Sequence, residues 1–124
     1  MAKQIVGADE YENPNVVKAV LKKNGDALYF SRHSIPFVKN NNSNEAIKKF
    51  KIHKHIGIYA FRADVLLTVT KLQQTELEKA ESLEQLRWLE NNFSIRVIET
   101  TEETFAVDTP DDLLKIEKLL KEKK

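Results

Sequence analysis

The sequence feature that most constrains the fold is an Asn-Gly pair between two apolar runs. Residues 16–21 and 27–31 are rich in Val, Ala, Leu and aromatic side chains, and Asn24 and Gly25 lie between them. Asn-Gly is the pair that tight hairpin turns prefer, because their central residues need a positive φ. The pattern therefore predicts an antiparallel hairpin. Pro36 cannot donate to a strand ladder, so the chain is expected to leave the sheet before it.

Helical and strand patterns follow one another along the rest of the chain. The polar run of residues 39–44 predicts a loop, and a short helical turn is expected at 46–50. Residues 55–60 and, more weakly, 95–99 have the pattern of strands. Apolar residues at helical spacing predict a helix over residues 62–72.

Two further helices have clear start signals. Thr75 and Glu78 have the spacing of a capping box, and the helix that they begin is expected to run to about Asn91. Pro110 suits the first position of a last helix. We therefore predict an α/β fold with a mixed sheet and a hairpin excursion, in one domain over residues 1–124. The last helix is expected to bury an apolar stripe formed by Leu113, Ile116, Leu119 and Leu120.

The charge balance argues against two classes of partner. The 20 basic and 19 acidic residues give a net charge of +1, whereas a nucleic-acid or membrane-surface binder would need a basic excess on one face. There is no cysteine, so thiolate chemistry, disulfides and cysteine-based zinc sites are excluded. No apolar run reaches the length of a membrane span. A cytoplasmic protein is the expectation.

The stretch H-I-G-I-Y at residues 55–59 places polar side chains in an apolar segment. If it is a strand, His55, Gly57 and Tyr59 share one face. Gly57 suggests the close approach of a backbone or a ligand, or plain packing against a neighbour. Taken alone, Tyr59 fits a core tyrosine with its hydroxyl satisfied. His53 and His55 make a weak metal pair, since no third ligand lies nearby in sequence, and we expect His53 on the surface and His55 half-buried.

Polar side chains in two other segments could bind a hydroxylated, acidic ligand. Glu84 and Gln85 could reach the hydroxyl groups of a bound sugar, or they could simply lie on an exposed helix face with pairs such as Glu84 and Arg87. Arg32 follows an apolar strand and could hold a ligand carboxylate with two parallel hydrogen bonds. It could equally pair with Asp26 or Glu12 on the surface.

Asp108 stands at a junction between an apolar segment and the last helix. It could cap that helix, in competition with Thr109. It could instead bind Mg²⁺, which takes one or two protein carboxylates together with phosphates and water. The local sequence leaves both readings open.

Five segments in order resemble one enzyme family. They are N-P-N-V-V-K at 13–18, A-L-Y-F-S-R at 27–32 followed by Ile35-Pro36, H-I-G-I-Y at 55–59, E-S-L-E-Q-L-R at 81–87 and V-D-T-P-D-D-L at 107–113. Over about residues 10 to 120 the chain resembles the C-terminal half of the 3-deoxy-manno-octulosonate (Kdo) cytidylyltransferases, or CMP-Kdo synthetases. That family makes CMP-Kdo and pyrophosphate from CTP and Kdo for lipopolysaccharide synthesis, with Mg²⁺ required.

The resemblance implies a set of roles and a fold. Arg32, His55, Tyr59, Glu84 and Gln85 match positions that line the family's Kdo pocket, and Asp108 matches a catalytic, magnesium-binding aspartate. The hairpin and residues 31–36 match the region through which the family forms homodimers. The implied fold is part of the three-layer fold of nucleotide-diphospho-sugar transferases.

Departures from the family pattern limit what the resemblance implies. His33-Ser34 replaces the usual pair before Ile-Pro, and the asparagine-rich loop at 40–44 lacks the usual pattern. The segment that carries the family's nucleotide-binding loop has no counterpart here, so we expect no turnover by these residues alone, and self-association to cover exposed surfaces. A non-catalytic binding or assembly module derived from the same fold, or a cytidylyltransferase for another acid sugar such as sialic acid, are the alternatives.

Overall fold

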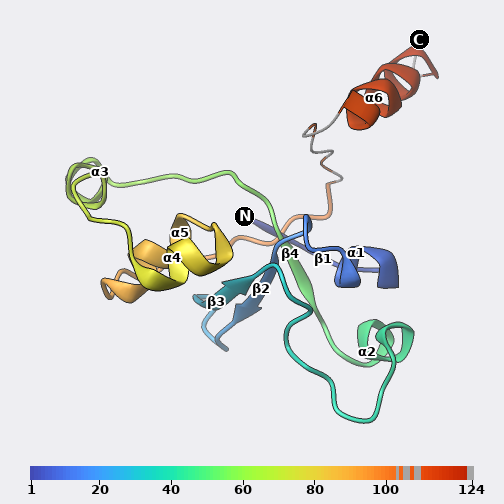
Figure 1. Cartoon of the computed structure of the whole chain (residues 1–124), viewed down its shortest axis with the longest axis horizontal. Helices are drawn as coiled ribbons and strands as arrows, with labels where there is room; N and C mark the ends of the chain where they lie inside the picture. The colour runs from blue at the N-terminus through green and yellow to red at the C-terminus, as the bar shows by residue number, and fades with distance from the viewer. Residues whose placement is uncertain (103, 105–106, 108–109, 123–124) are drawn as a thin grey trace.

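The Asn-Gly turn joins two antiparallel strands, as predicted. In the computed structural model, which describes residues 1–102, 104, 107 and 110–122, β2 (Lys18–Leu21) pairs with β3 (Ala27–Ser31), and Gly25 has a φ of +88°. Figure 1 shows the hairpin beneath the helices that cover it. The other described elements are β1 (Ala2–Gln4), α1 (Ala8–Glu12), α2 (Ser43–Lys49), β4 (His53–His55), α3 (Ala63–Val69), α4 (Glu76–Glu81), α5 (Gln85–Glu90) and α6 (Pro110–Glu122).

The strands form one sheet in the order β1-β4-β2-β3, and every pair of these strands is antiparallel. Residues 95–100 hydrogen-bond to both edges of it. Ala27 N–H donates to the carbonyl of Ile95 (2.9 Å), and Ala2 N–H donates to the carbonyl of Ile98 (3.0 Å). The predicted strand at 95–99 is thus reduced to two isolated bridges, of which the one between Ala2 and Glu99 is parallel. The α/β prediction is confirmed.

Two clusters of buried apolar side chains hold the helices to the sheet. In one, α1 and α2 pack against the chain around β1 and β4 through Ile5, Tyr11, Ala46, Ile47 and Ile52. In the other, the segment of α4 and α5 covers the hairpin through Ala19, Ala27, Phe30, Leu83 and Leu86. This second cluster brings the segment at 81–87 against β3.

The single helix predicted from Thr75 to Asn91 is wrong. Thr75 caps α4, and its backbone N–H reaches the Glu78 carboxylate at 3.4 Å, as the capping-box spacing predicts. The helix ends at Ser82, which adopts the left-handed conformation (φ 53°), and α5 begins at Gln85. Helical spacing of leucines continues through the break, so periodicity alone could not reveal it.

Other predicted elements shift in extent. β4 spans His53–His55, so residues 56–60 lie beyond the strand. His53 is buried rather than on the surface, because β4 lies between β1 and β2. A Cβ added at Gly57 would meet no described atom within 4 Å, so the predicted close approach there is not observed. The loop at 39–44 is shorter than predicted, since Asn42 caps α2 through the Glu45 backbone and side chain.

The last helix begins at Pro110, as predicted, but its apolar side chains are not buried. Leu113 is 50% exposed and Leu120 62% exposed. Figure 1 shows α6 apart from the sheet and the other helices. Among the described helices, none is long and apolar enough to cross a membrane.

Leu86 is the side chain through which α5 enters the hairpin cluster, and it is completely buried. Leu86→Ala should lower the free energy of unfolding by about 2–5 kcal/mol, because truncation removes apolar contact and leaves a cavity. Unfolding in urea measures this change in free energy. The matched control is Leu67→Ala on α3, where the side chain is 65% exposed, and a change there above about 0.5 kcal/mol would contradict the assignment of the core.

Candidate functional site

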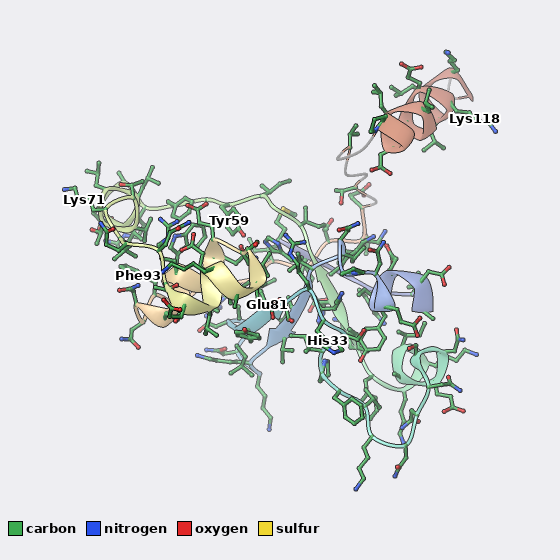
Figure 2. The ribbon with its side chains drawn as sticks, viewed as in Figure 1. His33, Tyr59, Lys71, Glu81, Phe93 and Lys118 are labelled. Carbon is green, nitrogen blue, oxygen red and sulfur yellow. The ribbon has the colours of Figure 1, made fainter. Side chains whose placement is uncertain are left out.

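Aromatic side chains from three segments line one cavity of about 620 Å³. After β4 the chain leaves the sheet, and the rings of Tyr59 and Phe61 each meet Trp88 of α5 edge-on, with centroids 5.0 and 5.2 Å apart. Residues 93–98, with Val65 and Val69 of α3, complete the wall. The H-I-G-I-Y segment therefore meets Trp88, the residue that directly follows the segment at 81–87, although the two lie far apart in sequence. Figure 2 shows Tyr59 on the side of the molecule where α4 and α5 lie.

His55 lies at one end of this cavity between two aromatic rings. Its centroid is 5.1 Å from Phe30 and 5.4 Å from Tyr59. Burial lowers the pKa of His55 to about 4, so the imidazole is neutral at pH 7. Its Nε2 atom is buried and has no hydrogen-bond partner among the described residues. A neutral imidazole with an unpaired nitrogen can bind a ligand hydroxyl or carboxylate by a hydrogen bond, but not by charge.

Tyr59 and Glu84 are linked electrostatically. Burial raises the pKa of Tyr59 above its ordinary value, and the negative charge of Glu84 raises it further. The Glu84 side chain is 64% exposed and lies 3.7 Å from the Arg87 guanidinium, a loose pair. The principal partner of Arg87 is instead Glu78, which accepts two of its hydrogen bonds at 2.7 and 2.5 Å. Glu84 is therefore free to meet a ligand close to Tyr59.

Gln85 is the first residue of α5 and is only 5% exposed. Its Nε2 group is buried with no hydrogen-bond partner among the described residues. Buried amides are nearly always hydrogen-bonded in folded proteins, so an unpaired one suggests a ligand or water. Gln85 does not line the cavity, and neither does Thr75, whose Oγ1 is buried without a partner in the same way. The buried His53 Nε2 lies 3.5 Å from the Glu99 carboxylate.

Arg32 does not line the cavity. Its Nε donates to the carbonyl of Glu81 (2.8 Å), and its two terminal nitrogens reach the carbonyls of Ser82 and Pro14, both at 3.3 Å. The surface pairs considered for it are not formed, because Asp26 accepts from Arg96 and Glu12 accepts from Ser43. The structure thus places Arg32 against the same turn that precedes Glu84 and Gln85.

No metal set is assembled by the described residues. No group of three or more His, Asp or Glu side chains among them is placed to hold a metal ion. Asp108, on which the magnesium prediction rests, lies outside the described residues. Magnesium therefore stays a prediction, and the description of the site rests on the other five predicted residues.

Several lining residues carry no signal in the local sequence. Phe30, Phe61 and Trp88 form walls of the cavity, and two arginines, Arg62 and Arg96, stand at it. Periodicity predicts that such aromatic residues lie in a core, and nothing in the local sequence says that they face a cavity. The arginines pair with Asp64 and Asp26 respectively.

A sequence model of the family described as cytidylyltransferase matches residues 1–100. The 3-deoxy-manno-octulosonate cytidylyltransferase of Phocaeicola vulgatus is 50% identical over 117 residues, covering 94% of this chain and 46% of the relative. That of Bacteroides thetaiotaomicron is 52% identical over 110 residues, 89% of this chain and 44% of the relative. The chain thus spans about half the length of the curated relatives it matches.

A solved structure of similar fold is that of a CMP:2-keto-3-deoxy-manno-octonic acid synthetase complexed with CTP. The TM-score is 0.85 at 39% sequence identity, and the match covers 99% of this chain and 48% of that one. The likeness extends over nearly all of this chain, so it supports the arrangement of the segments around the cavity as well as the class of fold.

The environment of His55 predicts a measurable pH dependence. Its pKa in the folded chain is about 4, against 6.5 for an ordinary histidine. Below pH 6.5 the unfolded chain takes up a proton that the folded chain does not, so this histidine should lower the stability as the pH falls from 6.5 to 4. An NMR titration of the ring protons should give a midpoint near 4. His55→Gln should remove this part of the pH dependence, and a midpoint above 6 would contradict the burial of the ring.

Proposed function

This chain belongs to the cytidylyltransferase family, and on that premise we propose that it carries the acid-sugar side of an enzyme that makes CMP-Kdo and pyrophosphate from CTP and Kdo for lipopolysaccharide synthesis. The observation that supports the proposal most is the contact of Tyr59 with Trp88, the residue that directly follows the segment at 81–87, together with the buried, unpaired nitrogens of His55 and Gln85. The relatives named for this activity support the choice of sugar.

The chemistry of the cavity suits a sugar acid. The apolar faces of a sugar ring pack well on aromatic side chains, and its hydroxyl groups need polar partners placed around them. Tyr59 and Trp88 supply the first, and His55 supplies the second within the cavity lining. Glu84, whose charge acts on Tyr59, and Gln85 lie outside that lining at the start of α5, and in the proposal they reach the sugar from there. Because His55 is neutral at pH 7, we assign it a hydrogen bond to the sugar rather than neutralisation of its carboxylate.

Positioning is the main task that these residues perform in the proposed reaction. The anomeric hydroxyl of Kdo must attack the α-phosphate of CTP in line, and holding the reactants in that geometry supplies much of the rate. His55, Tyr59, Glu84 and Gln85 orient the sugar, and Arg32 holds the turn beside them. We propose that the CTP site lies in the part of the family fold without a counterpart in this chain, so these residues alone should give no turnover.

The proposal also includes a metal ion, a dimer interface and a cellular location. Mg²⁺ would be held by Asp108, as the resemblance implies, and would supply charge neutralisation at the reacting phosphate. A homodimer would form through the hairpin and residues 31–36, where Leu28 is 54% and the adjoining Phe37 85% exposed. The proposed location is the cytoplasm.

Titration of the chain with Kdo tests the proposed sugar site. Calorimetry should show saturable binding, and Gln85→Leu or Glu84→Ala should weaken it about tenfold or more, because each change removes a hydrogen bond to a charged or buried group. Glu90→Ala is the matched control, since Glu90 is an exposed glutamate on the same helix.

The competing readings give different results. Tighter binding of N-acetylneuraminic acid than of Kdo would favour the sialic acid alternative. An absence of binding to either sugar, together with a stable dimer in sedimentation, would favour the assembly module. Equal losses in Glu84→Ala and Glu90→Ala would contradict the assignment of Glu84.

A further inference from the structure

The backbone of Arg32 is held from both sides by charged side chains of opposite sign. Its carbonyl accepts a hydrogen bond from Lys18 Nζ (2.6 Å), and its N–H donates to Glu81 Oε2 (2.9 Å). Lys18 belongs to β2 and Glu81 ends α4. Figure 2 shows Glu81 where α4 meets the hairpin. Hydrogen bonds to charged groups are the stronger kind, so this peptide segment is fixed more firmly than a strand end usually is.

The three N–H donors of the Lys18 ammonium all bond to backbone carbonyls. It is completely buried, and its ammonium also donates to the carbonyls of Val16 (2.6 Å) and Asn13 (2.9 Å). An ammonium has three donors and no acceptor, so three carbonyls satisfy it. Burial lowers the pKa of Lys18, and the negative charge of Glu81 partly offsets this effect. None of these contacts reaches the cavity. Burying a lysine lowers stability unless its contacts compensate, and here they hold the backbone carbonyls of Asn13, Val16 and Arg32 in place.

Glu81 joins the strand end to the turn that carries the sugar-side residues. Its carboxylate accepts from Ser31 Oγ (2.6 Å) as well as from the Arg32 N–H, and its own carbonyl accepts from Arg32 Nε (2.8 Å). The Arg32 guanidinium then reaches the carbonyl of Ser82 (3.3 Å), the left-handed residue that breaks the helix. Glu84 and Gln85 follow Ser82 by two and three residues.

We propose that Lys18 and Glu81 are positioning residues, which fix Arg32 and, through it, the Ser82 turn that presents Glu84 and Gln85 to the sugar. The inference rests on the proposed function for the identity of the ligand. It goes further in assigning a role to two side chains that do not touch the ligand. Their effect passes through the backbone of Arg32, so it should be visible in amide protection as well as in affinity.

Two substitutions remove the two contacts separately. Lys18→Met keeps the apolar stem and leaves three carbonyls without a donor, and Glu81→Gln keeps the shape of the side chain but turns one acceptor into a donor. The partly exposed Glu81 tolerates substitution better than the buried Lys18, so Glu81→Gln decides the matter if Lys18→Met does not fold. The control is Lys54→Met. Lys54 is also buried and lies opposite Lys18 where β4 pairs with β2, but its ammonium pairs with Glu10.

Hydrogen exchange and Kdo titration are measured on the full chain. Both variants should exchange the Arg32 amide about tenfold faster and bind Kdo about tenfold more weakly, since each loses a hydrogen bond to a charged group. Lys54→Met should lower the melting temperature and leave both quantities within about twofold.

The outcomes separate this inference from the proposed function. A failure of the unaltered chain to bind Kdo contradicts the proposed function and the inference that rests on it. If the unaltered chain binds, unchanged Kdo affinity or unchanged Arg32 exchange in folded Glu81→Gln overturns the inference alone. An equal loss of affinity in Lys54→Met also overturns it, because the effect is then one of general stability.

Discussion

The arrangement of the site depends on one aromatic contact. Trp88 of α5 packs edge-on against Tyr59 and Phe61, which lie just beyond β4. Edge-to-face pairs at these distances add to the free energy of burying the rings, by about 0.5–1.5 kcal/mol each. The contact draws the chain that leaves the sheet after His55 onto the helix pair that carries Glu84 and Gln85. Trp88, Tyr59 and Phe61 thus form part of the cavity wall, and their contact brings the H-I-G-I-Y segment next to the helix that follows the segment at 81–87.

The charged and polar side chains divide into those that bond within the fold and those that could bond to a ligand. Arg87 and Glu78, and Lys18 with its three carbonyls, are satisfied internally. The Nε2 atoms of His55 and Gln85 are buried and unpaired among the described residues, and Glu84 is largely exposed near Tyr59. A buried unpaired group lowers stability, and proteins keep such groups chiefly at functional sites. Of these available groups only His55 lines the cavity, and it is the one that places the ligand there.

Local signals in the sequence predicted the elements that are fixed locally. The Asn-Gly turn, the Thr75 cap and Pro110 each act through the backbone of a few residues, and each stands where predicted. The break at Ser82 could not be predicted, since it is stabilised by Arg32, which lies 50 residues away in the chain. The same holds for His53, buried because β4 inserts between β1 and β2. The local sequence predicts candidate residues at 55–59 and 81–87, but the contact of Tyr59 with Trp88 and the effect of Glu84 on Tyr59 depend on tertiary packing.

The central claim is that residues from β4 onward and from the α4–α5 turn surround one sugar acid. Intermolecular NMR contacts between bound Kdo and selectively labelled side chains test it most directly. The account predicts contacts from one bound sugar to the rings of His55 and Tyr59 and to the side-chain amide of Gln85. Contacts confined to one of the two segments, or a sugar bound elsewhere on the chain, would contradict it.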